Sequence, residues 1–459
     1  MFGYTSYAYH CYQSPWSAYK SVERNYQLQW EIEGGSQDLW DWVVLIGDIW
    51  KLHGQDVTCC CPYLPGSFDC PPQNPAYKIN SGYKAWEFLV YIFGYCPTLL
   101  YNLLPCWYWC NFCQLVSAIQ ILQQCTVSAF QLQSAYWSTL EFTKEYEAIY
   151  YCHMVSWLHF CWQSIHGLSH LTQDIACLGP GIYLSQWTLE CMIGNLGQEI
   201  KQPSKPHANL VNCGLWCSQL SALQAMLPNL SPDSTVLPQG AVDLRDGYIR
   251  LRAWDVMCVT LDRQCTDRQR ASAICMFLLS ELGQDKFPTD WEPMYIRWAC
   301  LHLPNLQIAH CMWKEMSHAS STNSVQHSHN VKVDQIVLYY PMITLTPLQF
   351  TCRGIIWIGE VQFYFQSNHT GEECTYVLVL LWTLPDLNRL RESFNMAYSC
   401  VYMYRTYLQV IDMKIIASIV AMVPMMPSKG DWSSQFFLLE KPGLEIIQLQ
   451  DVNALSGGQ

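Results

Sequence analysis

Charged residues are scarce in this chain. Asp, Glu, Lys and Arg together make up 14% of its 459 residues, against about 25% in an ordinary soluble protein. Positive charge is the scarcer sign, since 25 Lys and Arg stand against 37 Asp and Glu, for a net charge of −12. Proteins that bind nucleic acid present a basic surface to the phosphate backbone. We therefore expect no nucleic-acid partner.

Long apolar runs are missing as well. A membrane-spanning helix needs about 18–20 apolar residues, whereas the longest candidate, residues 415–426, is shorter and its composition predicts a strand. The first residues have neither the basic start nor the apolar segment of a secretory signal. These features predict a cytoplasmic protein that does not bind membranes.

No sequence typical of a phosphate-binding loop occurs, neither G-x-G-x-x-G nor G-x-x-x-x-G-K-[ST]. Cysteine, by contrast, is abundant, with 24 residues. Cys110-x2-Cys113 and Cys213-x3-Cys217 have the spacing of zinc ligands, but each lies in an apolar context without a matching second pair. We expect free structural thiols in a reducing compartment and no metal.

Four histidines, His310, His318, His327 and His329, flank a segment rich in Ser and Asn. Their spacing places them on no common face of a helix or strand. This pattern favours a solvated loop over a histidine-based site.

The residues that are plentiful are hydrophobic (51%) and aromatic (14%), enough for a large core. From residue 241 onward, pairs of predicted strands alternate with predicted helices. This order indicates an α+β protein with an antiparallel sheet covered by helices. The predicted helices cover 36–54 (capped by Ser36 and closed by Gly54), one or two segments of 113–170, 218–227, 267–282, 373–384 and a segment near 386–400; the predicted strands cover a hairpin at 241–256, then 330–340, 360–366 and a pair at 405–423.

Several predicted strands share an unusual alternation, in which polar or aromatic residues occupy one face and aliphatic residues the other. A solvated outer face is one explanation, and the lumen of a closed barrel is the other. Arg and Lys are the usual partners of phosphate oxygens, and aromatic faces stabilise cations. A shared lumen would therefore suit an anionic, partly organic ligand. The polar sets are Arg250, Arg252 and Trp254; Asn330, Lys332 and Asp334; Glu360, Gln362, Tyr364 and Gln366; and Tyr407 and Gln409.

Four segments resemble the dimethylallyltryptophan-synthase family of fungal aromatic prenyltransferases. VDLRDGYIRLRAW (242–254) is similar to the family's D-L-K-D-G strand pair, and LIGDIWKLHGQDVTCCCPYL (45–64) to its N-terminal L-L-G-K block. EVQFYF (360–365) and VKV (331–333) resemble two further family strands and occur in family order. The resemblance implies one domain over residues 1–459: a closed ten-stranded antiparallel barrel ringed by helices in repeated ααββ units.

The resemblance also implies a function. Family members transfer a dimethylallyl group from dimethylallyl diphosphate to an aromatic acceptor, usually an indole such as tryptophan or a tryptophan-containing compound, in alkaloid (secondary) metabolism. They need no metal or other cofactor, so the implied partners are the two small substrates. The resemblance does not decide whether the chain forms a homodimer.

The resemblance assigns roles by position. It places Arg252, Lys332 and Gln362, together with Trp254, Asp334, Tyr364 and Tyr407, at the prenyl diphosphate, and Leu89 and Val90 at the aromatic acceptor. Four positions depart from the family, and one of them is Asp334, which stands at the place of a tyrosine. Leu99 occupies the place of the glutamate that accepts the indole proton, Gln239 the place of a lysine, and Cys110 the place of an arginine.

These departures, the acidic Asp334 among them, leave a second interpretation open. In it the chain is a catalytically impaired or non-catalytic relative that only binds an aromatic or isoprenoid ligand. A third interpretation, a disulfide-rich secreted protein, is disfavoured by the missing signal.

Overall fold

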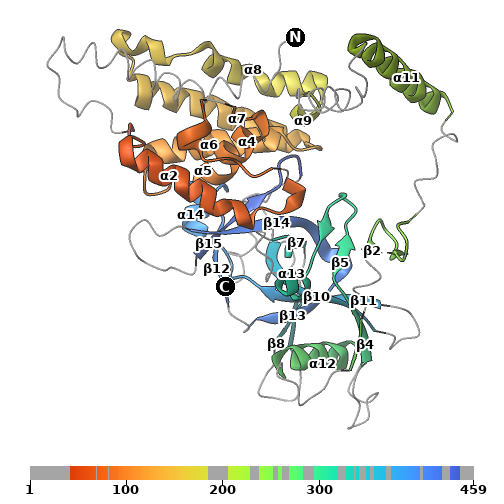
Figure 1. Cartoon of the computed structure of the whole chain (residues 1–459). Helices are drawn as coiled ribbons and strands as arrows, with labels where there is room; N and C mark the ends of the chain where they lie inside the picture. The colour runs from red at the N-terminus through yellow and green to blue at the C-terminus, as the bar shows by residue number, and fades with distance from the viewer. Residues whose placement is uncertain are drawn as a thin grey trace.

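The computed structural model describes residues 42–68, 70–80, 82–184, 205–227, 237–251, 257–260, 268–282, 294–318, 327–334, 337–340, 348–351, 356–367, 374–403, 407–425 and 435–444. Its secondary structure is mixed, with helices in the first half of the chain and antiparallel strands in the second (Figure 1). This agrees with the predicted α+β class.

The helices between residues 47 and 184 form a layer above the strands, and the helix at 206–226 lies apart from them with no buried residue (Figure 1). Helix α7 begins at a reciprocal cap, in which the Ser128 hydroxyl accepts from the Gln131 N–H and the Gln131 amide oxygen from the Ser128 N–H. In the α6 helix, 13 of the 17 residues are buried. The helices are α2 (Gly47–Cys60), α3 (Pro75–Lys78), α4 (Ala85–Phe88), the π-helix η4 (Leu89–Tyr95), α5 (Cys96–Leu99), α6 (Cys106–Leu122), α7 (Ala129–Tyr146), α8 (Gln163–Leu178), α9 (Gly181–Leu184) and α11 (Pro206–Met226).

Among its described residues, the second half has three further α-helices, the 3-10 helix η10 (Met413–Ile415), two main sheets and a separate pair of strands, β8 and β9. A nine-stranded antiparallel sheet follows the order β12-β15-β14-β7-β10-β11-β13, with β4 on β10 and β3 on β4, and a four-stranded sheet follows β1-β2-β5-β6. The strands are β1 (Val242–Asp243), β2 (Ile249–Leu251), β3 (Met257–Thr260), β4 (Met294–Trp298), β5 (Cys300–His302), β6 (Ile308–Ala309), β7 (Asn330–Asp334), β8 (Val337–Tyr340), β9 (Leu348–Thr351), β10 (Ile356–Ser367), β11 (Cys374–Leu381), β12 (Ser399–Val401), β13 (Leu408–Asp412), β14 (Ile416–Pro424) and β15 (Gln435–Glu440); the helices are α12 (Arg268–Leu282), α13 (Met312–His318) and α14 (Leu387–Glu392).

The large sheet is curled into a half-barrel. The N–H groups of Thr383 and Asp386, just after β11, donate to the carbonyls of Val401 and Ser399 in β12. Strand β12, one end of the strand path, is thereby brought back to the end of β11. The strand pairs found among the described residues do not close the sheet into a ten-stranded barrel.

The curl gives the sheet an inner and an outer face. Side chains from strands that are not neighbours meet on the inner face, including Trp382 after β11, Cys400 in β12 and Val420 in β14. The outer face carries Val331, Val361 and Val379. It is covered by the four-stranded sheet and, over β14 and β15, by the helical layer.

A β-bulge at Gln362 interrupts the alternation of β10. The partners of Val361 and Phe363 are Val379 and Leu378, so one residue of β10 is extra. Glu360 and Phe363 consequently point to the same face, and Tyr364 to the other. The expectation that Glu360, Gln362, Tyr364 and Gln366 share one face is therefore wrong.

Most predicted elements are confirmed, with shifted ends. Helix α12 and the 242–251 hairpin lie where predicted, whereas the helix expected at 36–54 is described from Gly47 and runs past Gly54 to Cys60. The helix predicted at 373–384 is wrong, because this segment forms the central strand β11. A strand buried on both faces has a continuous apolar run, which periodicity cannot distinguish from a buried helix. No helix within the described ranges is long and apolar enough to cross a bilayer.

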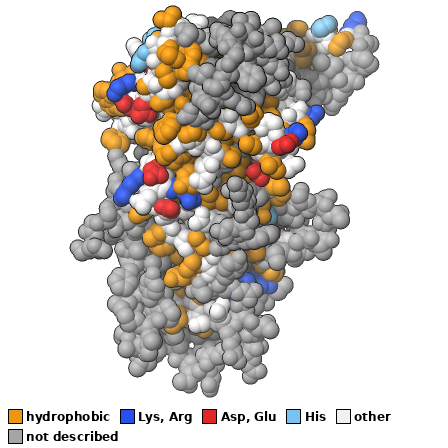
Figure 2. All heavy atoms as spheres, turned by 90° about the vertical axis from the view of Figure 1, so that its left-hand side faces the viewer, with side chains coloured by type: hydrophobic (Ala, Val, Ile, Leu, Met, Phe, Trp, Pro, Cys, Tyr) orange, Lys and Arg blue, Asp and Glu red, His pale blue; other side chains and the backbone are white. Residues whose placement is uncertain are grey.

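The space-filling view agrees with the low charge of the sequence. On the face that Figure 2 shows, hydrophobic side chains lie between scattered charged ones rather than in a separate region. Polar groups able to do chemistry must therefore be sought in the interior as well as on the surface.

Candidate functional site

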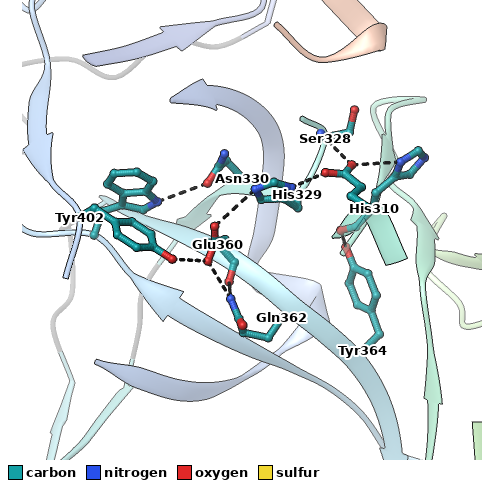
Figure 3. Close-up of polar contacts among 10 residues, drawn as sticks. His310, Ser328, His329, Asn330, Glu360, Gln362, Tyr364 and Tyr402 are labelled. Atoms are coloured by element: carbon teal, nitrogen blue, oxygen red, sulfur yellow. Dashed lines mark hydrogen bonds and ion pairs between the residues drawn. The ribbon is translucent and has the colours of Figure 1, made fainter. Parts of the chain in front are cut away.

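Ionisable side chains gather at the point where β10 changes neighbours. The first half of β10 pairs with β7 and its second half with β4. Glu360 lies at this junction, next to the bulge, and is 5% exposed. One of its oxygens, Oε2, accepts hydrogen bonds from Gln362 Nε2 at 2.8 Å and from the Tyr402 hydroxyl at 2.9 Å (Figure 3).

His329 lies between two carboxylates. Its Nε2 is 3.4 Å from Glu360 Oε1, and its Nδ1 bonds to Glu315 Oε2 in α13 (Figure 3). Glu315 Oε1 accepts from the Ser328 N–H at 2.9 Å and lies 3.2 Å from His310 Nδ1. Glu315, His329 and Glu360 form a buried acid–imidazole–acid chain, named here the Glu–His–Glu chain.

The contacts within the Glu–His–Glu chain fix its protonation. Burial alone would lower the pKa of His329, but its hydrogen bonds to Glu315 and Glu360 raise that pKa to about 9. Burial would raise the pKa of Glu315, and hydrogen bonds from His310 and His329 lower it to about 2. For Glu360, burial is likewise outweighed by His329, and its pKa is lowered. At neutral pH the imidazole is therefore a cation between two carboxylates.

A second ion pair crosses the curl. Lys332 Nζ in β7 donates to Glu440 Oε1 in β15 at 3.1 Å, and both side chains are mostly buried. Strand β14 separates β7 from β15, so this contact spans the inner face. A lysine ammonium group binds phosphate oxygens as it binds carboxylate oxygens.

Three aromatic rings lie on the same inner face. The ring centroid of Trp382 is 4.9 Å from those of both Tyr402 and Phe436. The Tyr402 hydroxyl is also the donor to Glu360, and the Trp382 N–H donates to the Asn330 side chain. The aromatic cluster is thus joined to the Glu–His–Glu chain by a hydrogen bond.

Two of the residues expected at the prenyl diphosphate lie on the inner face. They are Lys332 and Gln362, and the Gln362 amide oxygen accepts from Arg270 of α12 at 2.9 Å. Tyr364 lies on the outer face, where its ring stacks on Trp298 at 5.8 Å. Its hydroxyl makes a long contact of 3.4 Å to the His310 carbonyl.

The residues expected near the acceptor lie elsewhere. Leu89 and Val90 are buried in the helical core, and Leu99 packs against that core from α5. Cys110 of α6 packs there too, with its Sγ 3.8 Å from that of Cys106. The structure does not bring these residues to the Glu–His–Glu chain.

The remaining predicted residues are dispersed. Gln239 is exposed in a turn before β1, Tyr407 is 40% exposed before β13, and the backbone of Asp334 pairs with Ile356. Arg252 and Trp254 lie outside the described residues. Arg250, on the same predicted strand face, donates to Gln366 at 3.0 Å and lies over the Trp298 ring, on the outer side of the large sheet.

Sequence reasoning missed His329, Glu315 and Tyr402. The prediction of a solvated loop is wrong for His329, which is 3% exposed. The only signal was the cluster of histidines itself, because the spacing along the chain does not reveal that Glu315 and Glu360 meet one imidazole. No group of three or more His, Cys, Asp or Glu suited to a metal ion occurs in the described ranges.

Comparison with known proteins finds no relative of this chain. Neither the family models, nor the curated proteins, nor the solved structures contain a match to this chain.

Proposed function

We propose that this protein transfers a dimethylallyl group from dimethylallyl diphosphate to an aromatic acceptor, an indole such as tryptophan, without a metal. The observation that carries the proposal is the composition of the inner face. Lys332, three aromatic rings and an ionised carboxylate share it. These are the groups needed to hold a diphosphate, shield an allyl cation and accept a proton.

Each group has a role in the proposed reaction. Lys332 and Arg270 neutralise the leaving diphosphate, and Gln362 lies between Arg270 and Glu360. Trp382 and Tyr402 present ring faces and edges to the allyl group and exclude water from the cation. Ionisation of the prenyl diphosphate requires that the charges of the diphosphate and the allyl cation be stabilised. In a buried site, charge-assisted hydrogen bonds act more strongly than in water.

The closure of the sheet into a barrel is part of the same proposal. We propose a closed, ten-stranded antiparallel barrel with repeated ααββ units and the reaction in its lumen. The backbone hydrogen bonds from Thr383 and Asp386 to β12 support this closure, because they join one end of the strand path to the segment after β11.

Turnover tests the proposal. The protein is incubated with dimethylallyl diphosphate and tryptophan, with excess EDTA, and products are identified by mass spectrometry. We expect prenylated tryptophan at an EDTA-insensitive rate. Isopentenyl diphosphate is the matched control, since it cannot ionise to an allyl cation and should give no product. Absence of product from tryptophan and from a panel of other indoles would contradict the proposal.

One observation favours a second candidate function, in which the protein binds an aromatic or isoprenoid ligand without catalysing a reaction. Lys332 is already paired with Glu440, and a carboxylate beside the diphosphate site weakens phosphate binding. Binding of a prenyl diphosphate analogue without any turnover would identify this second function.

A further inference from the structure

The proposed reaction requires a proton acceptor. When an aromatic ring gains an allyl group, it becomes a cation that must lose a proton. Leu99, at the position of the expected glutamate, has no basic group and packs against the helical core. A carboxylate on the inner face must then supply the base, if the proposed function holds.

Among the described residues, two carboxylates form hydrogen bonds with Lys332 or with the aromatic cluster of the inner face. They are Glu440 and Glu360. Glu440 is bound to Lys332, and would lie beside the diphosphate rather than the acceptor. Glu360 is bound to the Tyr402 hydroxyl at 2.9 Å, and Tyr402 belongs to the aromatic cluster. We propose that Glu360 is the catalytic base that accepts the proton lost by the aromatic acceptor; this assignment rests on the proposed function.

The surroundings of Glu360 suit that role. His329 and Gln362 hold the carboxylate through separate oxygens, Oε1 and Oε2, so its orientation is fixed. Glu315 holds the other nitrogen of His329 and is a positioning residue. In a regular strand, the side chains of Glu360 and Gln362 would stand side by side on one face, separated by the length of two residues. The bulge in β10 changes the direction of the Gln362 side chain, which bonds to the Glu360 carboxylate.

The step balances without another reactant. The bond between C1 of the dimethylallyl group and the diphosphate oxygen breaks, and diphosphate leaves with the electron pair. Ring π electrons form the new C–C bond, and the resulting ring cation gives its proton to Glu360 Oε1, because Oε2 already accepts two hydrogen bonds. Glu360 passes that proton to water as product leaves. The ring cation is a strong acid, so a carboxylate with a lowered pKa still accepts its proton.

The test separates ionisation from proton removal. Glu360→Gln keeps the size of the side chain and, through its amide oxygen, the hydrogen bonds from Gln362 and Tyr402, but it removes the basicity and the contact with the His329 cation. Bridging-¹⁸O dimethylallyl diphosphate reports ionisation, because the label scrambles to non-bridging positions whenever the C–O bond breaks and reforms. We expect Glu360→Gln to lose about 10²–10⁴-fold in prenylated product, while label scrambling continues.

Three further variants serve as controls. Glu392→Gln, on the exposed side of α14, should behave as the wild type. Glu315→Gln removes the other carboxylate from His329 and so holds Glu360 less firmly; it should lower the ratio of prenylated product to scrambled substrate, by less than Glu360→Gln does. Glu360→Asp keeps a base but draws it back by one methylene from the acceptor, so it should form product about tenfold more slowly than the wild type; it replaces Glu360→Gln if that variant does not fold.

The outcomes distinguish the two proposals. A wild type that makes no product overturns both. An active wild type with Glu360→Gln, or with Glu360→Asp in its place, within threefold of its product rate overturns the assignment of Glu360 and leaves the function standing. Loss of product together with loss of scrambling also overturns the assignment, since Glu360 would then serve only the structure of the prenyl diphosphate site.

Discussion

At the scale of single residues, burial and hydrogen bonding decide which side chains carry charge. Alternation along β7 predicted that Lys332 and Val331 occupy opposite faces, and they do. The Glu–His–Glu chain could not be predicted, because Glu315, His329 and Glu360 meet only through tertiary structure. Even the histidine-rich segment gave a wrong indication, since surface loops and buried imidazoles have the same local composition.

His329 should make stability depend on pH. Its pKa of about 9 lies above the ordinary value of 6.5, so its contribution is complete below about pH 6.5 and is lost as the pH rises through 9. Removing one partner of a buried pair costs about 3–5 kcal/mol. We predict that His329→Gln loses about that much unfolding free energy near pH 6 and clearly less near pH 10.

Urea unfolding at the two pH values measures this difference. His166→Gln, on the exposed surface of α8, is the control and should match the wild type. A deficit of His329→Gln that is equal at both pH values would mean that the imidazole is not a cation in the folded protein.

Tyr364 provides a second prediction at this scale. Its ring is fully buried on the outer face, and the hydrogen bond of its hydroxyl among the described residues is the long contact to the His310 carbonyl. Tyr364→Phe should therefore cost less than about 1.5 kcal/mol in stability and leave turnover nearly unchanged. Tyr402→Phe, which removes a hydrogen bond to Glu360, should reduce turnover more. The reverse order of the two turnover rates would place Tyr364 at the reacting groups.

At the scale of elements, the bulge in β10 and the strand β11 show where pattern reasoning fails. Period-2 alternation assumes an uninterrupted strand, and the single extra residue at Gln362 exchanges the faces of everything after it. As a result Phe363 and Phe365 pack against Ile274 and Phe277 of α12. The α12 helix itself was predictable, since its apolar stripe and its length are typical of an amphipathic helix.

The contact between η4 and β15 gives a prediction for elements. A Cβ on Gly94 would overlap Leu439 Cδ1, and Leu439 is buried, so its side chain can move only partly. Ala favours a helix over Gly by about 1 kcal/mol, whereas overpacking costs about 1–3 kcal/mol. We predict that Gly94→Ala is destabilising in the wild type but neutral or stabilising in a Leu439→Ala background.

Chemical denaturation of the four proteins in this double-mutant cycle measures the coupling. A destabilisation by Gly94→Ala that is the same in both backgrounds would mean that Leu439 does not pack on Gly94. The docking of η4 on β15 would then need another explanation.

At the scale of the whole molecule, the sheet is covered on its outer face by the helical layer and the four-stranded sheet, and it curls around its inner face. Composition and element order predicted the mixture of helices with antiparallel strands. They did not predict the half-barrel, because curvature depends on bulges and on contacts such as those between β12 and the end of β11. The inner face that results brings Lys332, Glu360 and the aromatic cluster onto one surface.

Binding of a non-reactive analogue tests most directly that this inner face holds a prenyl diphosphate. Titration calorimetry with dimethylallyl S-thiolodiphosphate is performed on the wild type, on Lys332→Met and on Lys414→Met, whose lysine pairs with Asp246 at the surface. We predict binding by the wild type and by Lys414→Met, and a loss of about 10- to 150-fold in Lys332→Met, corresponding to one charge-assisted hydrogen bond. No binding by the wild type, or equal affinity of all three proteins, would contradict the account.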